Sequence, residues 1–121
     1  MAARVRSVVV AVAAVLTMAA CGSSDGSDAE TSSGVVVDIA VKDGSVTPAA
    51  GRVDVKVGQK VTLHLTSDTD EEIHVHTVPD HEYELRPGDD VKHSFTVRSP
   101  GVVSIEAHHL DVTAVRLVVT P

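Results

Sequence analysis

Residues 55–78 have the sequence VKVGQKVTLHLTSDTDEEIHVHTV, and their pattern of apolar and polar side chains predicts the fold class. Apolar and polar side chains alternate strictly through residues 61–66, which is the two-residue period of a strand with one buried face. Val61, Leu63 and Leu65 form the apolar face. The polar segment SDTDEE at 67–72 then predicts a loop, because such clusters of turn-forming residues interrupt strands. The stretch therefore predicts a strand, a loop and a second strand, and no helix.

Short β-branched segments of this kind recur through residues 35–121, and turn residues separate them. We expect turns at KDGS (42–45), KVGQ (56–59), SDTDEE (67–72), RPGD (86–89) and SPG (99–101). This spacing is typical of an all-β sandwich or barrel. A second alternation of apolar and polar side chains runs through residues 91–97 and ends at Phe95 and Val97. We expect the apolar face of this strand to form one inner wall of a sandwich, and the apolar face of residues 61–65 to form the other. We expect strands at 35–42, 52–57, 60–67, 73–78, 83–86, 91–98, 102–107 and 113–119.

The first twenty residues have the features of a secretion signal. Arg4 and Arg6 precede an apolar segment of 14 residues, which is shorter than a membrane-spanning helix of about 20 residues. The sequence MAAC at 18–21 resembles the lipobox of bacterial lipoproteins, which implies that Cys21 carries palmitate or a similar acyl chain. Cleavage after Ala20 without lipidation and an uncleaved anchor are the alternatives. All three place the following residues on the extracytoplasmic side of the cell membrane.

These features divide the chain into three segments. Residues 1–20 are a signal peptide whose lipobox ends at Cys21, residues 21–34 are a flexible tether rich in Gly, Ser and Asp, and residues 35–121 are the folded domain. The tether has no apolar residue larger than alanine after Cys21, so it cannot bury enough surface to offset the entropy of ordering it. A lone cysteine also excludes a disulfide within the chain.

The composition limits the classes of function. The formal net charge is −7, and the only aromatic residues are Tyr83 and Phe95, so we expect no nucleic acid as a partner. No serine has the glycine-flanked context of a hydrolase nucleophile, and no glycine-rich loop is suited to phosphate. We therefore expect a binding protein and not an enzyme. We also expect this protein to be a monomer.

The stretch 55–78, together with SPGVVSIEAHHL at 99–110 and VRLVVTP at 115–121, resembles a cupredoxin. The resemblance covers the whole domain and implies an eight-stranded Greek-key sandwich with a metal site at one end. It also implies that His74 matches the first histidine ligand. The cysteine ligand of blue copper is expected at about 106–108, where this chain has Glu-Ala-His. Blue-copper electron transfer needs that thiolate, so the resemblance supports the fold and not the redox role.

The histidines offer a different set of metal ligands. Residues two apart on a strand point to the same side, so His74 projects with His76 and Glu106 projects with His108. Three imidazoles and a carboxylate suit copper(II) or zinc. We expect these four residues to meet on neighbouring strands as a copper site, with zinc as the alternative metal. The competing hypothesis is that they only donate hydrogen bonds at the end of a sheet.

The remaining histidines and two neighbouring acids have other expected roles. His81 is an additional candidate ligand or a residue of the acidic rim, and His109 is an additional candidate if a loop frees it from the strand alternation. His93 is expected to be a satisfied buried histidine, and His64 to lie on the solvent face with no role. Glu71 and Glu72 are ordinary loop acids, or they orient His74 or His76 through the other ring nitrogen.

Two functions are compatible with these features. The first is a lipid-anchored, cupredoxin-like protein that binds copper or another divalent metal for delivery, sensing or buffering, with a membrane transporter or a metal acceptor protein as its partner. The alternative is a metal-free β-sandwich that serves as an interaction module of the cell envelope. The two functions are distinguished by whether the segment His74-Val75-His76 lies close to the segment Glu106-Ala107-His108, as the metal-binding function requires.

Overall fold

The computed structural model describes residues 33–121, which contain the whole predicted domain. The predicted signal peptide, Cys21 and most of the predicted tether lie outside the described residues. No helix in the described part of the chain is long and apolar enough to cross a membrane.

The described residues form nine strands. They are β1 (Val35–Lys42), β2 (Ser45–Thr47), β3 (Gly51–Lys56), β4 (Lys60–Ser67), β5 (Glu71–Val75), β6 (His81–Leu85), β7 (Asp90–Thr96), β8 (Gly101–Ala107) and β9 (Val112–Thr120).

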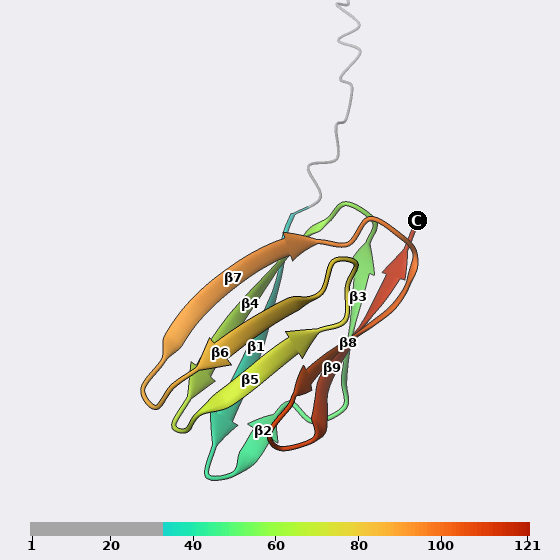
Figure 1. The fold of residues 1–121 in the computed structure, drawn as a ribbon. Helices are drawn as coiled ribbons and strands as arrows, with labels where there is room; N and C mark the ends of the chain where they lie inside the picture. The colour runs from blue at the N-terminus through green and yellow to red at the C-terminus, as the bar shows by residue number, and fades with distance from the viewer. Residues whose placement is uncertain (1–32) are drawn as a thin grey trace, which may run out of the picture.

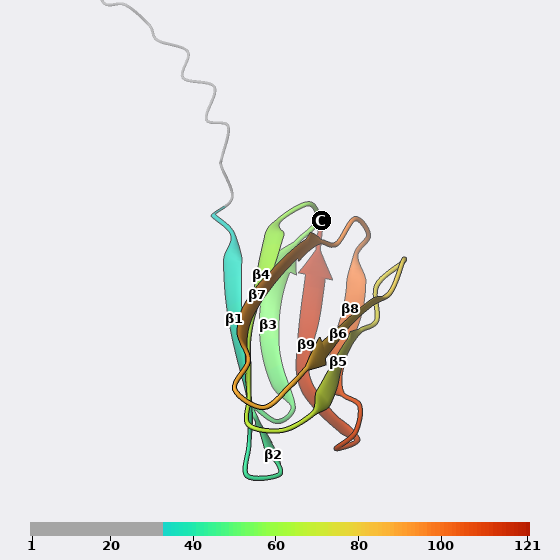
Figure 2. The same cartoon turned by 60° about the vertical axis from the view of Figure 1, so that its left-hand side comes forward.

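Two sheets pack face to face (Figure 1, Figure 2). The four-stranded sheet has the order β2-β1-β4-β7, and the five-stranded sheet has the order β3-β9-β8-β5-β6. Strand β1 is parallel to β4, and β3 is parallel to β9, while the other neighbours are antiparallel. The described chain enters and leaves at the same end of the sandwich (Figure 1).

The turns form where the sequence predicts them. Gly58 and Gly88 have φ angles of 78° and 91°, and a residue with a Cβ atom adopts this region only with strain. Each glycine therefore allows a tight connection, after β3 and before β7. The side chain of Asp89 stabilises the second turn by accepting a hydrogen bond of 2.8 Å from the backbone N–H of Arg86.

The strand predictions need two corrections. Strand β2 was not predicted, because it has three residues and pairs only with the end of β1 across a tight turn at 43–44. The predicted strand 73–78 instead ends at Val75. There the N–H of Thr77 donates to the Val75 carbonyl at 2.8 Å, and the Thr77 hydroxyl donates to the Pro79 carbonyl at 2.7 Å, so the chain turns.

The prediction of the two inner walls is also wrong. Strands β4 and β7 are antiparallel neighbours in one sheet, with Val61 opposite Phe95 and Leu65 opposite Val91, so their apolar faces form a single wall. The other wall comes from the five-stranded sheet. Sequence alternation identifies which side chains point inward, but it does not show which strands share a sheet.

The core lies between the two sheets and is almost wholly aliphatic. Buried side chains from both walls form one cluster, and Phe95 is its only aromatic member. The fully buried ones at its centre include Leu63, Leu65, Ile73, Ile105 and Leu117. Because each strand of the five-stranded sheet buries one face only, its opposite face is available for polar side chains.

Candidate metal centre

Strand β5 places His74 on the outer face of the five-stranded sheet, and His76 follows the end of this strand with the same parity. Its alternate residues Ile73 and Val75 are fully buried, so His74 and His76 point away from the core. The centroids of the two imidazole rings are 4.2 Å apart, and the ring planes are inclined by 38°. The prediction that the two histidines project together is therefore met by the geometry.

Glu106 joins this pair from β8. It is opposite His74 in the register of β5 and β8. The Nε2 of His76 lies 3.1 Å from the Oε2 of Glu106, so this imidazole donates a hydrogen bond to the carboxylate. The structure thus brings together His74, His76 and Glu106, three of the four residues proposed as ligands.

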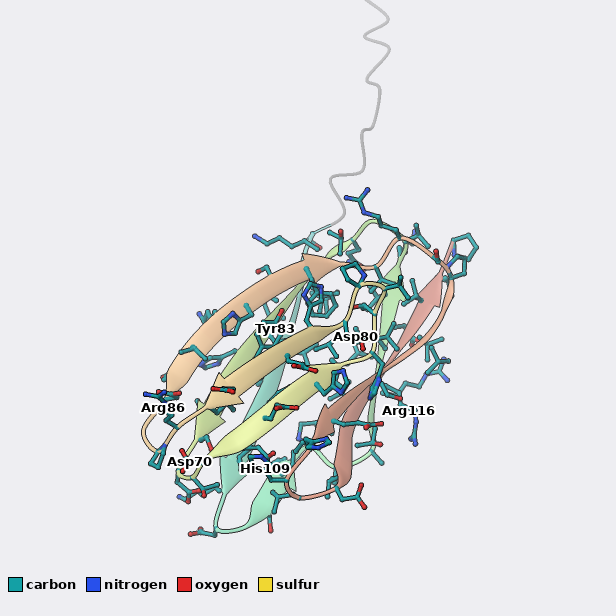
Figure 3. All side chains as sticks on the ribbon, in the orientation of Figure 1. Asp70, Asp80, Tyr83, Arg86, His109 and Arg116 are labelled. Atoms are coloured by element: carbon teal, nitrogen blue, oxygen red, sulfur yellow. The ribbon has the colours of Figure 1, made fainter. Side chains whose placement is uncertain are left out.

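His74 also has acidic neighbours on the other side. Its Nε2 is 3.3 Å from the Oδ2 of Asp80 and 4.0 Å from the Oε1 of Glu82, which is opposite His74 on β6. Figure 3 shows Asp80 next to the end of β5. The side chain of His74 is only 18% exposed, so carboxylates from two sides enclose a partly desolvated imidazole. The acidic side chains around it give this part of the sheet a negative charge that attracts cations.

His108 and His109 lie farther along, in the turn between β8 and β9. The N–H of His108 donates to the carbonyl of Glu72 at 2.8 Å, which places His108 beside the start of β5, whereas His76 follows the end of β5. The ring of His108 is edge-on to that of His109, with 6.2 Å between centroids. The structure therefore does not bring His108 next to His76, and its role as a ligand stays a prediction.

His81 lies on the inner side of its sheet, opposite Val75. Its ring packs against Phe95 at 5.5 Å between centroids and parallel to Tyr83 at 6.1 Å. Tyr83 in turn stacks on His93 at 4.1 Å, so an aromatic stripe joins the edge strands β6 and β7. Burial in this stripe raises the pKa of Tyr83. His81 and His74 thus point to opposite faces, and His93 is a half-buried stacking residue.

The donor atoms determine which metal centres these residues can form. Within residues 33–121 no three or more His, Cys, Asp or Glu side chains have metal-binding geometry as they stand. No cysteine or methionine occurs in this range, so the donors do not fit a blue-copper centre. Imidazole and carboxylate do fit copper(II) or zinc. Here they are engaged in hydrogen bonds that a metal ion would have to replace.

The outer face of the other sheet holds a contact that sequence reasoning missed. The Nδ1 of His64 is 2.7 Å from the Oδ1 of Asp38 on β1, and its Nε2 is 2.6 Å from the Oδ1 of Asp90 on β7. The expectation that His64 has no role is wrong, since it links three neighbouring strands. Alternation placed its side chain on the correct face, but its partners follow from the order of the strands in the sheet.

The two carboxylates raise the pKa of His64 above its ordinary value of 6.5, and the hydrogen bond with Asp90 contributes most. Because the pKa is higher in the folded chain than in the unfolded chain, the contact stabilises the fold fully below about pH 6.5. The stabilisation is lost as the pH rises through the raised pKa.

An NMR titration of the histidine side chains checks this effect. We expect His64 to titrate above 6.5, and Asp90→Asn to lower its pKa more than Asp38→Asn does. The thermal midpoint of the wild type should fall between pH 6 and pH 8.5 by more than that of His64→Gln. Equal pH dependence of the thermal midpoint in the two proteins would show that this contact does not contribute to the stability of the fold.

Glu71 is the second residue that sequence reasoning missed. It is the first residue of β5, and its side chain is completely buried, so the expectation of a loop acid or of a partner of His74 or His76 is wrong. Its Oε1 accepts hydrogen bonds from the N–H groups of Glu72 and His109, at 2.8 and 2.7 Å. The signal was present in the sequence, since Glu71 has the same strand parity as Ile73 and Val75.

No family model matches the chain, and no curated protein matches its sequence. Several solved structures, among them the following three, are similar in fold. Fet3p, a multicopper oxidase that functions in iron import, has a TM-score of 0.56 at 15% identity, over 71% of this chain and 23% of the oxidase chain. Auracyanin from Roseiflexus castenholzii has a TM-score of 0.53 at 13% identity, over 74% of this chain and 99% of auracyanin. A purple cupredoxin from Nitrosopumilus maritimus has a TM-score of 0.50 at 18% identity, over 71% and 99% of the two chains.

These likenesses concern the arrangement of the strands alone, and they agree with the two-sheet topology described above. The part of the chain at residues 33–121 is therefore a cupredoxin-like β-sandwich.

Proposed function

We propose that this chain is a membrane-tethered, extracytoplasmic protein that binds copper or another divalent metal through histidines and handles the metal without blue-copper electron transfer. The pair of imidazoles at His74 and His76 beside the carboxylate of Glu106 carries the proposal. Two imidazoles and a carboxylate on adjacent strands make a nitrogen-rich donor set, and the surrounding acids favour a cation. Binding of copper by proteins of this fold adds support to the choice of metal.

The tether belongs to the same proposal. Lipidation at Cys21 anchors the chain in the cell membrane, and residues 21–34 hold the domain within about 20 Å of it by the reach of a flexible linker. A site on the exposed face of a sheet is accessible to another protein, so a membrane transporter or a metal acceptor protein is the proposed partner. The site offers reversible binding and not catalysis.

Titration of Cu²⁺ into the full chain, held in a mild detergent, tests the metal site. We expect one equivalent with a nitrogen-rich type-2 electron paramagnetic resonance spectrum, because imidazoles supply the donors. The double variant His74→Ala/His76→Ala should lose this equivalent. His64→Gln is the matched control, since it removes a histidine from the outer face of the opposite sheet, and it should bind Cu²⁺ as the wild type does.

One observation favours the alternative of a metal-free interaction module. Both imidazoles already have carboxylate partners, so the cluster is complete as a set of hydrogen bonds. Weak Cu²⁺ binding without a defined stoichiometry, unchanged in the double variant, would support the module and contradict the metal site.

A further inference from the structure

The two ends of the sandwich have different surfaces. The described chain enters at one of them, and three connections between strands lie at the same end (Figure 1, Figure 2), at 57–59, 76–80 and 97–100. We call these connections and the strand residues next to them the entry end. The opposite end has the connections 43–44, 68–70, 86–89 and 108–111.

Exposed valines gather at the entry end. The large apolar side chains that are exposed in residues 33–121 are Val36, Val57, Val78 and Val102. Val36 and Val102 are the second residues of β1 and β8, and both strands start at this end. Val57 and the fully exposed Val78 lie in the connections after β3 and β5. A single exposed apolar side chain is ordinary, but the confinement of all four to one end indicates a surface with a partly apolar partner.

Positive charge gathers at the same end. Lys56 and Lys60 flank the connection after β3, Arg98 lies in the connection after β7, and all three side chains are exposed. None of the three forms a salt bridge with another residue of the described range. The one acidic side chain in the three connections is Asp80, whose carboxylate faces His74. The three cations are therefore available to an anionic partner.

The opposite end has the reverse charge. Besides Arg86 and two histidines, its four connections hold five acids, which are Asp43, Asp68, Asp70, Asp89 and Asp111. The domain is therefore polarised along its length, with the positive charge at the entry end. An anionic surface attracts the entry end and repels the other, so it also orients the domain.

A cavity of about 430 Å³ opens at the entry end, between the connections after β5 and β7. Val78, Arg98 and Val102 line it, together with Phe95 of the core. A guanidinium can form two parallel hydrogen bonds with a phosphate, and the valines offer apolar contacts beside it. This combination fits the surface of a bilayer, where phosphates lie above acyl chains.

We propose that the entry end docks on the surface of the cell membrane, with Lys56, Lys60 and Arg98 against the phosphates of anionic phospholipids and the exposed valines among the headgroups. The inference rests on the proposed function in one respect, because lipidation at Cys21 holds this end near the membrane. Membrane anchors often combine an acyl chain with a basic surface in this way.

Docking fixes an orientation that a flexible tether alone does not. His76 lines the same cavity as Arg98, so the docked domain presents the pair of His74 and His76 next to the membrane. A metal-binding partner embedded in the membrane would then meet the imidazoles directly.

Paramagnetic broadening of NMR signals in lipid nanodiscs tests the docking. The full chain is attached, without metal, to discs of phosphatidylcholine alone or of phosphatidylcholine with an equal amount of phosphatidylglycerol, and both kinds of disc carry a trace of lipid with a gadolinium chelate as headgroup. We expect the backbone N–H signals of Val57, Val78 and Val102 to broaden more strongly on the discs with phosphatidylglycerol. The signals of Gly44 and Asp111, at the opposite end, should stay sharp. Added salt should reduce the broadening, because it screens the charges.

The variant Lys56→Gln/Lys60→Gln/Arg98→Gln should weaken docking by about a hundredfold, since each cation near an anionic membrane surface contributes a factor of about five. Broadening at the entry end should then fall to its level on phosphatidylcholine alone.

The matched control is Lys42→Gln/Lys92→Gln/Arg116→Gln. It removes the same number of exposed positive charges away from the entry end, and it should dock as the wild type does. Equal broadening on the two kinds of disc would overturn the inference and leave the entry end free for a protein partner. An equal loss in the two triple variants would also overturn it, because the net charge of the chain would then explain the attraction. Attachment to the neutral discs reports the tether alone, so its failure would contradict the proposed anchoring, while broadening on the anionic discs would still report docking.

Discussion

Leu65→Ala is expected to lower the free energy of unfolding by about 2–5 kcal/mol, the usual cost of removing a buried leucine side chain. Leu65 is 0% exposed and lies on β4, which is flanked by β1 and β7 in the four-stranded sheet. Its neighbours in register are Ile39 and Val91. Backbone hydrogen bonds on both sides hold β4 in place, so the sheet cannot collapse into the space left by the side chain.

Chemical denaturation followed by circular dichroism measures the effect. Val36→Ala is the matched control, because this valine is 62% exposed, and its loss should change the stability by less than about 0.5 kcal/mol. Similar stabilities for the two variants would mean that the two sheets do not pack as tightly as described.

Glu71→Ala is expected to destabilise the fold by about 2–4 kcal/mol, because two backbone N–H groups lose the buried carboxylate that accepts their hydrogen bonds. These groups belong to Glu72 on β5 and to His109 in the turn after β8. The carboxylate therefore links the start of β5 to the turn after β8. Glu71→Gln keeps an oxygen acceptor at the same position and should be less destabilised than Glu71→Ala.

Thermal unfolding of the two variants tests this structural role. If Glu71→Ala unfolds at the same temperature as the wild type, the buried carboxylate does not support the turn. Hydrogen exchange at the backbone N–H of His109 tests the contact directly, because this N–H should exchange faster in Glu71→Ala than in the wild type.

Much of the fold was predictable from local pattern. The alternation at 61–66 placed β4 and its inward-facing leucines correctly, and glycine identified the turns at 58 and 88. The cupredoxin-like sandwich predicted from residues 55–78 and 99–121 is confirmed by the topology and by the solved structures of the same fold. The N-terminal predictions concern residues outside the described range and stay predictions.

The order of the strands was not predictable in the same way, and the site depends on it. His74 and His76 share a face by parity alone, but Glu106 and Asp80 reach them through sheet pairing and through the loop after β5. The partners of His64 follow from β1 and β7 flanking β4, which no local pattern contains. Sequence alone therefore identified the histidines and missed most of the carboxylates that surround them.

The position of β9 has a consequence for the order in which the chain can fold. Strand β9 is the last strand, yet it lies inside the five-stranded sheet, between β3 and β8. Its pairing with β3 is parallel and joins residues 51–56 to residues 115–120, so β3 has no strand partner until residues 115–120 are available. A ribosome or a translocation channel that still holds residues 115–120 would therefore keep β3 unpaired and the five-stranded sheet incomplete. Closure of so long a loop also predicts folding in milliseconds to seconds and not in microseconds.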